Sequence, residues 1–494
     1  MITQTLLLGA LLGARLGVAA PAADLPAHPD QIQFPPLTYE PPQAAAHRHV
    51  LKNGVTVFVV EDHRVPLVDV SITIKADDRQ EPTGLEGLHS ATYDLLSDGG
   101  SQAHDAAWIE EETAFLGAYL ESGTEDPYGG NLRLQTLTKD LEHGLDLAFE
   151  VLRTPRFQAD RLREWQDKRL ASFKERNDDP ERLERMEWRR LMYDDQTFRP
   201  ATAASVGALT PQTLKEWHER WTHPGNLLVR VSGDITPKQI LPLLEKHMKG
   251  WKKGSSSFPN PEAGYAAVKP GVYLIHKPIN QTRVRCILPG LDRDDPQWHA
   301  AWLMNELLGG AGMSSKLLNR IRTQEGLAYS VGSQLEERVF GPGIFWAGFQ
   351  TKVESTQYAM SLLVDEYRKM AAGEIDEEAL ENSKNQLIQA FPTWFASAST
   401  IASVLAEEEL SGRSQGNPRF YQELRERVAR VSKADVQAAA RRMLQTDQLI
   451  WVLVGDAQAV QAPDAGHGLS LEQFGPLTRL PLYDPLTQEP LPLD

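Results

Sequence analysis

The sequence predicts an α+β fold built from two homologous domains, each a mostly antiparallel sheet packed with helices. An internal repeat carries this prediction. Residues 209–234 and 431–456 each read as a capped helix followed by an apolar strand that ends in Gly-Asp, at a constant offset of 222 residues. Apolar helices that end at Leu96 and at Leu308 before glycines match in the same way. Two long repeats indicate a duplicated domain, because a solenoid needs several short ones.

The first half begins with two predicted strands. The apolar runs 55–60 and 67–74 follow Asn53-Gly54, which is a strong turn signal. Hydrophobic periodicity predicts helices over 84–97, 105–117, 138–153, 159–176, 181–193 and 211–222. The apolar run 227–231 is the last predicted strand of this half.

The second half repeats this mixture of strands and helices. Strands are predicted at 272–275, 283–288, 343–350 and 449–454. Helices are predicted near 296–308, 354–372, 377–391 and 433–444. Pro392 is expected to break or kink the chain after 377–391, because proline lacks the backbone N–H that a helix interior needs.

Residues 312–333 are predicted to form a helix followed by a strand. Ser314 or Ser315 can cap the helix, and Gly326 can end it. The expected apolar face of the helix consists of Leu317, Leu318 and Ile321. Residues 328–333 then alternate as a strand does.

These features divide the chain into six segments. They are a signal peptide (1–23), an N-terminal extension (24–45), a first domain (46–253), a linker (254–271), a second domain (272–460) and a C-terminal tail (461–494). The linker is rich in glycine, serine and proline. The tail is rich in proline and leucine and is expected to lie along the surface or to fray.

The first 23 residues are predicted to be a leader. Residues 6–14 form a short apolar core, and small residues follow at 18–22. The core is too short to span a bilayer as a stable membrane anchor. The expected location of the mature protein is therefore periplasmic or secreted.

Composition excludes several classes of protein. The formal net charge of −16 argues against a nucleic-acid partner, which would need a basic face. Cys286 is the only cysteine, so the chain can form no internal disulfide and no thiolate zinc cluster.

One helix carries the frame of a metal site without its ligands. Residues 84–100 read Gly-Leu-Glu-Gly-Leu-His-Ser-Ala-Thr-Tyr-Asp-Leu-Leu-Ser-Asp-Gly-Gly. This run resembles the zinc helix of the pitrilysin/insulinase family, in which two His of H-x-x-E-H bind Zn²⁺ and the Glu activates water. The alignment puts Ser90, Tyr93 and Asp94 at those three positions. None of these substitutions preserves the site, because serine is a poor zinc ligand and tyrosine is no general base.

The resemblance covers about residues 46–460 and implies a mitochondrial-processing-peptidase-like fold for both domains. It also implies that the third zinc ligand, a Glu, would fall near Leu170 and Ala171, where no Glu stands. All metal positions of the family are then vacant. We expect no metal and no cofactor in this chain, and we expect zinc in a partner subunit.

A second motif of the family is retained. Arg322 and Tyr329 lie seven residues apart in a segment that resembles the family's second-half motif. The resemblance implies that the Tyr hydroxyl donates to the oxyanion and that the Arg holds the substrate backbone, which is electrostatic stabilisation of a developing charge. The alternative is a surface arginine and a half-buried strand tyrosine.

Three interpretations of function follow. In the first, the chain is the non-catalytic subunit of a heterodimeric zinc peptidase that cleaves peptides, and a homologous subunit with H-x-x-E-H is its partner. In the second, it is a catalytically inert peptide-binding or scaffold protein. In the third, it is an enzyme with an unrecognised metal site, for which the candidates are His47 with His49 and Glu86 with His89. Neither pair comes with an assured third ligand.

Overall fold

The computed structural model describes residues 38–194, 197–254, 258 and 265–493. The described residues from Pro41 onward form one compact unit. The predicted signal peptide, much of the N-terminal extension and part of the linker lie outside the described residues. None of the helices in the described part combines the length and the apolar character that a bilayer crossing needs.

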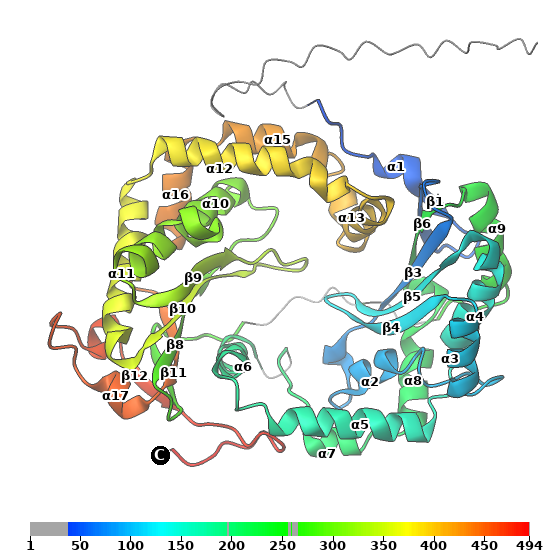
Figure 1. The fold of residues 1–494 in the computed structure, drawn as a ribbon, viewed down its shortest axis with the longest axis horizontal. Helices are drawn as coiled ribbons and strands as arrows, with labels where there is room; N and C mark the ends of the chain where they lie inside the picture. Colours follow the sequence, from blue (N-terminus) through cyan, green and yellow to red (C-terminus); the bar gives the residue numbers. More distant parts are fainter. Residues whose placement is uncertain (1–37, 195–196, 255–257, 259–264, 494) are drawn as a thin grey trace, which may run out of the picture. The chain divides into compact units, whose positions relative to one another are not determined.

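The structure contains one six-stranded sheet from each half of the chain (Figure 1). The strands of the first sheet are β1 (Arg48–Val50), β2 (Thr56–Glu61), β3 (Leu67–Lys75), β4 (Tyr119–Glu125), β5 (Gly129–Leu137) and β6 (Leu227–Gly233). Their order is β1-β2-β6-β3-β5-β4. Only the β2–β6 pair is parallel.

The second sheet repeats this topology. Its strands are β7 (Gly271–His276), β8 (Gln281–Pro289), β9 (Ala328–Leu335), β10 (Ile344–Lys352), β11 (Ile450–Gly455) and β12 (Leu477–Leu480). Their order is β12-β7-β11-β8-β10-β9, and β7–β11 is parallel as β2–β6 is. The α+β fold and the two homologous halves are confirmed, and the strand order differs only in the outer strand beside β2 or β7.

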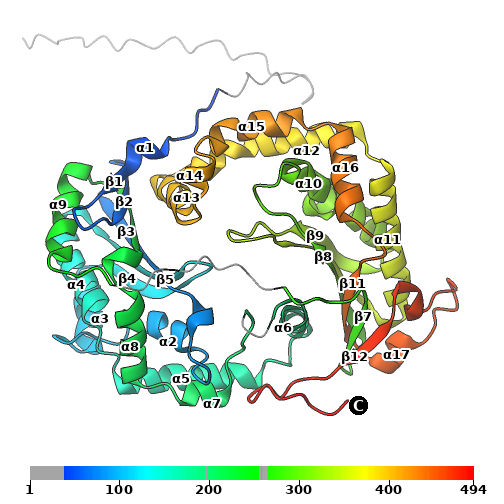
Figure 2. The same cartoon turned by 180° about the vertical axis from the view of Figure 1, so that it is seen from behind.

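Helices flank each sheet, as Figures 1 and 2 show from opposite sides. Those of the first half are α1 (Ala44–His47), α2 (Leu88–Asp94), α3 (Ala106–Phe115), α4 (Leu141–Arg153), α5 (Ala159–Lys174), α6 (Pro180–Met192), α7 (Ala203–Gly207), α8 (Pro211–Trp221) and α9 (Pro237–Met248). Those of the second half are α10 (Trp298–Asn305), α11 (Thr356–Ala372), α12 (Glu377–Ala390), α13 (Ala398–Leu410), α14 (Arg413–Gly416), α15 (Phe420–Arg430), α16 (Lys433–Met443) and α17 (Ala457–Gln461).

The repeat is visible at the level of single side chains. Thr210 accepts a hydrogen bond from the Thr213 backbone at the start of α8, and Ser432 accepts one from the Asp435 backbone at the start of α16. Both are capping boxes, so the same local signal starts the equivalent helix in each half. The expectation for Pro392 is also met, because α12 ends at Ala390.

The sequence missed the hairpin of β4 and β5. β5 alternates buried and half-buried positions, as a strand with one face in the core does. β4 has no apolar alternation, and it is a strand because its backbone pairs with β5 along its whole length. Helices α9, α13 and α15 were not predicted either.

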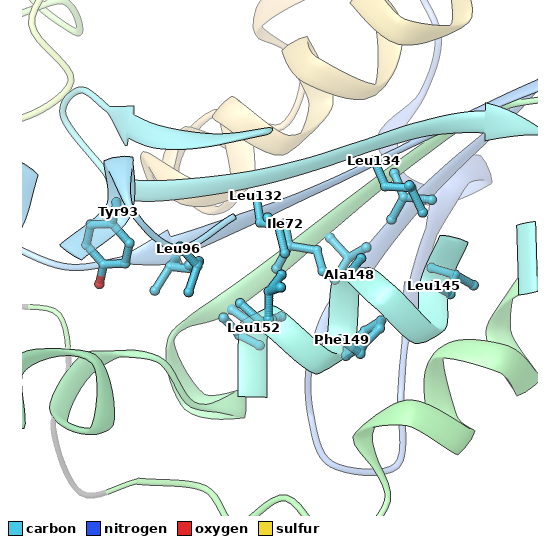
Figure 3. Packing of buried hydrophobic residues seen from close by; sticks show 14 of the residues in the cluster. Ile72, Tyr93, Leu96, Leu132, Leu134, Leu145, Ala148, Phe149 and Leu152 are labelled. Carbon is cyan, nitrogen blue, oxygen red and sulfur yellow. The ribbon is translucent and has the colours of Figure 1, made fainter. Parts of the chain in front are cut away.

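The core of the first half lies between its sheet and α4. Ile72, Leu132 and Leu134 point from the strands toward Leu145, Ala148, Phe149 and Leu152 of the helix (Figure 3). Each of these side chains is almost completely buried. Burial of a side chain of this size contributes about 1.5–3 kcal/mol, so this layer is a main source of stability for the sheet that carries α2.

Each half contributes a helix to the other half's sheet. α6 packs on β8 and β11, with Leu183 and Trp188 in one apolar cluster with Ile287 and Val452. α13 packs in turn on β2 and β6, where Leu405 and Ala406 contact Phe58 and Leu228. The exchange is reciprocal, and it ties the two halves together through buried apolar side chains.

Most residues of the C-terminal tail are exposed or half-buried, as expected of a surface segment, but the tail pairs with the second sheet and does not fray. Its β12 is a parallel edge strand on β7. Beyond β12, the carbonyls of Tyr483 and Pro485 accept hydrogen bonds of 2.9 Å from Asn177 and Arg176 of the first half. These backbone hydrogen bonds, which composition does not reveal, explain why the tail is held along the surface.

Candidate functional site

Helix α2 carries Ser90, Tyr93 and Asp94, the three residues that the resemblance aligns with the zinc motif. Gly87 precedes the helix with φ of +102°, a conformation that favours glycine. Ser90 is half-buried, and Tyr93 is fully buried. A Cβ atom at Gly130 of β5 would lie 2.3 Å from Cδ1 of Tyr93, so the ring packs directly against the glycine backbone. Burial raises the pKa of Tyr93, which keeps its hydroxyl protonated.

Asp94 is engaged by two side chains of α5. Trp165 donates its indole N–H to Oδ2 of Asp94 at 2.9 Å, and Arg169 lies 3.7 Å from the same oxygen. The Arg169 guanidinium also stacks over the Trp165 ring, 4.8 Å from its centre. The position of the second zinc-binding His therefore belongs to a polar cluster that joins α2 to α5.

The residues present do not fit zinc. Leu170 and Ala171, where the resemblance places the third ligand, are a half-buried and an exposed apolar residue of α5. Over the described ranges, no group of three His, Cys, Asp or Glu side chains is placed to hold a metal ion. The ring of His47 is hydrogen-bonded to the Val59 carbonyl, and Glu86 lies 3.5 Å from Arg199. Helix α2 thus contributes buried side chains to the core, and its Asp94 contacts polar side chains of α5.

Arg322 and Tyr329 lie together at the edge of the second sheet. Arg322 belongs to the π-helix Leu318–Gln324, and Tyr329 is the second residue of β9, the edge strand. The Arg322 guanidinium lies 4.9 Å from the centre of the Tyr329 ring, a cation–π contact. The ring is 85% exposed, and its hydroxyl makes no hydrogen bond within the part of the chain that the structure describes.

The helix that carries Arg322 differs in detail from the prediction. Leu317, Leu318 and Ile321 are buried and Gly326 has φ of +66°, as expected of an apolar face and a glycine stop. The Ser315 hydroxyl, however, donates to the Gly312 carbonyl and caps no backbone N–H. The turn that carries Arg322 is π-helical, and π-turns are frequent at functional sites.

This arrangement places the hydroxyl of Tyr329, a hydrogen-bond donor, beside the guanidinium cation of Arg322 at an exposed surface. The sulfur of Met313 lies 3.6 Å from the guanidinium of Arg322. The cation therefore has neighbours that hold it in place without neutralising its charge. An exposed hydroxyl beside it can donate to an oxygen that becomes negative during a reaction.

A cavity of about 460 Å³ also opens beside α2, and no sequence pattern indicated it. His89 and Ser90 of α2 line it, together with Asp78 after β3, Asp126 in the β4–β5 turn and Arg338 after β9. These residues are spread over 260 positions of the chain. Their only sequence signal is the acidic pair at 77–78 directly after a strand, which by itself indicates nothing about a site.

Known proteins resemble the chain over most of its length. A family profile described as "Peptidase M16 inactive domain" matches residues 208–387. An uncharacterized zinc protease of Rickettsia felis is 24% identical over 344 residues, which cover 68% of this chain and 81% of the relative. The non-peptidase homologue YmxG of Helicobacter pylori is 21% identical over 357 residues, which cover 71% of this chain and 80% of the relative.

The fold is also found among solved structures. The crystal structure of a peptidase M16 inactive domain from Pseudomonas fluorescens has a TM-score of 0.73 and 23% sequence identity. The similarity covers 83% of this chain and 97% of that one. At this level of identity the likeness concerns the fold alone.

Proposed function

We propose that this chain, which belongs to the pitrilysin (M16) peptidase family, is the non-catalytic subunit of a heterodimeric zinc peptidase. Its partner would be a homologous subunit that carries H-x-x-E-H, and its substrate a peptide. In this proposal Arg322 and Tyr329 act on a substrate that the partner's zinc site cleaves.

The observation that carries the proposal is the exposure of the Tyr329 side chain and of its hydroxyl. Its ring is held by Arg322 at 4.9 Å, yet its hydroxyl is not hydrogen-bonded within the described residues and the side chain is 85% exposed. A buried tyrosine usually bonds its hydroxyl within the protein, whereas the exposed hydroxyl of Tyr329 is available to a substrate. In α2, by contrast, the Tyr93 side chain is buried and the Asp94 carboxylate contacts Trp165 and Arg169 of α5.

The proposed separation of the zinc site and the oxyanion donor onto two chains is physically feasible. A zinc site needs all its ligands on rigid neighbouring elements of one chain, whereas a donor to the oxyanion can come from an opposing chain. The Tyr329 hydroxyl would donate to the developing oxyanion. The Arg322 guanidinium would hold a backbone carbonyl of the substrate already in the bound state.

A second candidate function is an inert peptide-binding protein. The contacts of Asp94 with Trp165 and Arg169 favour it, because they join α2 to α5 with no metal required. In that case Arg322 and Tyr329 would contribute to peptide binding only. A periplasmic or secreted location fits both candidates and remains a prediction from residues 1–23.

The test is steady-state kinetics of the chain reconstituted with its zinc-bearing partner. Tyr329→Phe should lower kcat by about 10²–10³ with little change in peptide affinity, since one oxyanion donor is removed. Tyr119→Phe is the matched control, because Tyr119 lies on β4, the equivalent edge strand of the first sheet, and is also exposed. If Tyr329→Phe turns over within about threefold of the parent, far inside the expected loss, the inert peptide-binding protein is the better description.

A further inference from the structure

A β-bulge interrupts the edge strand that carries Tyr329. This strand, β9, is the outer strand of the second sheet and lies beside β10 (Figure 1). Ala328 and Val331 are three residues apart in β9, but their partners in β10 are only two residues apart. Tyr329 and Ser330 therefore lie opposite a single residue of β10, Gln350. Bulges of this kind are frequent at sheet edges, where they change the direction of a side chain.

The bulge accounts for the exposure of Tyr329. Side chains of a regular strand alternate between the two faces of the sheet. Val331, Ser333 and Leu335 are all buried, so an uninterrupted strand would place Tyr329 on that same buried face. Instead, Tyr329 is exposed and Ala328 is buried, each the opposite of what unbroken alternation gives. The extra residue reverses the alternation at the start of β9 and directs the tyrosine outward.

The equivalent edge of the first sheet has no such bulge. There β4 pairs with β5 in constant register from Tyr119 to Glu125. The two edge strands occupy the same place in the shared topology, yet only the one that carries Tyr329 changes register. The bulge is therefore a feature of the half with the Arg/Tyr motif and not of the sheet topology.

The side chain of Thr351 holds the chain directly before the bulge. Thr351 of β10 is only 1% exposed, and its hydroxyl donates to the Leu327 carbonyl at 2.7 Å. The N–H of Leu327 donates in turn to the Ile321 carbonyl at 3.0 Å, so this residue is held on both sides. In a regular register Thr351 would lie opposite Tyr329 itself, displaced from Leu327 by about 3.3 Å along the strand. The hydrogen bond therefore favours the bulged register.

We propose that Thr351 is a positioning residue for Tyr329, whose orientation it fixes by holding Leu327 and so stabilising the bulge. The threonine hydroxyl is buried and acts on the tyrosine only through the backbone. The inference rests on the proposed function where turnover is concerned. Its effect on the bulge is measured on the chain alone.

The first experiment measures the stability of the bulge by hydrogen–deuterium exchange and mass spectrometry on the full chain. Thr351→Val has a similar shape but no hydroxyl. The backbone amides of residues 327–331 should exchange about two- to tenfold faster in this variant, the effect of one lost hydrogen bond. Thr351→Ala removes the donor without placing a methyl group beside the carbonyl and should give the same change. Thr351→Ser keeps the donor and should retain the parent rate.

The matched control is Thr282→Val. Thr282 lies opposite Thr351 on β8, is completely buried, and has a hydroxyl without a hydrogen-bond partner among the described residues. The same substitution, one strand further from Tyr329, should leave exchange at 327–331 unchanged. Equal acceleration by the two valine variants would show a general loss of packing and overturn the proposal. Unchanged exchange in both Thr351→Val and Thr351→Ala would overturn it as well.

A double-mutant cycle in the reconstituted pair connects the bulge to turnover. Thr351→Val should lower kcat by about two- to tenfold with little change in KM, because a less stable bulge holds the donor in place less of the time. In the Tyr329→Phe chain the same substitution should cause no further loss, since the hydroxyl that it positions is gone. An equal loss in both backgrounds would contradict the positioning role.

Failure of the proposed function gives a different result. Normal turnover of the Tyr329→Phe chain would refute the trans-acting role of Tyr329. Faster exchange at 327–331 in Thr351→Val would still establish that the threonine stabilises the bulge, because that measurement needs neither the partner nor a substrate.

Discussion

The guanidinium of Arg322 lies 4.9 Å above the ring of Tyr329, although the two residues belong to different elements. The contact orients both groups at an exposed sheet edge. We therefore propose that Arg322 also positions the tyrosine, beside its proposed contact with substrate.

The two functions of Arg322 can be separated. In the reconstituted pair, Arg322→Ala should raise KM and lower kcat, because it removes both the substrate contact and the support of Tyr329. Arg322→Lys keeps the charge but loses the planar stacking group, so it should recover KM more than kcat. Equal recovery of both constants by lysine would contradict the positioning function.

The chain alone should contain no tightly bound zinc. Tyr93 is buried against Gly130, and Asp94 contacts Trp165 and Arg169, so neither residue is available to bind a metal at the positions of the zinc motif. Elemental analysis of the purified chain after dialysis is the measurement, with a zinc-bearing family member treated in parallel. One equivalent of retained zinc would refute this prediction.

We expect that the packing of α6 on the second sheet is stabilised by a buried ion pair. Glu184 is fully buried and contacts Arg285 of β8, while Glu181 of the same helix is exposed and lies 3.3 Å from Arg283. Glu184→Gln should lower stability by about 3–5 kcal/mol, because it leaves a buried arginine unpaired. Glu181→Gln should cost less than about 1 kcal/mol. Thermal unfolding of the two variants compares them, and equal shifts would show that the ion pair contributes little.

The C-terminal tail should protect the connection between α5 and α6 from proteolysis. Ending the chain at Pro476 removes β12 and the partners of Arg176 and Asn177. Local opening should become easier by about 1–2 kcal/mol, so cleavage by trypsin at residues 174–176 should accelerate about tenfold. A chain that ends at Pro490 keeps these contacts and serves as the control. Equal cleavage rates of the two would mean that the tail contributes no protection.

His218 should make the fold sensitive to acid. It is buried in α8, where Nε2–H donates to the Leu152 carbonyl at 2.8 Å, and burial lowers its pKa from 6.5 to about 4. The folded state therefore resists protonation, so the contribution of His218 to stability is present above pH 6.5 and is lost as the pH falls toward 4.

His218→Gln tests this, because glutamine can donate to the same carbonyl and does not titrate. The difference in Tm between parent and variant should shrink as the pH falls from 7 to 4. His143→Gln, at a half-exposed position of α4, is the control for replacing a histidine by glutamine outside the core. A constant difference for His218→Gln would show that another group causes the acid sensitivity.

The sequence alone determined the duplicated α+β fold, and it led to two hypotheses, the loss of the zinc motif in α2 and the role of Arg322 with Tyr329. These are local properties, because capping residues, apolar periodicity and motif spacing act within about 25 residues of chain. Only the tertiary structure decided the exchange of α6 and α13, the attachment of the tail and the cavity that joins His89, Asp78 and Arg338. Each of these depends on contacts between segments far apart in sequence. Residues far apart in sequence become contacts only when the folded backbone brings their side chains within hydrogen-bonding or van der Waals distance.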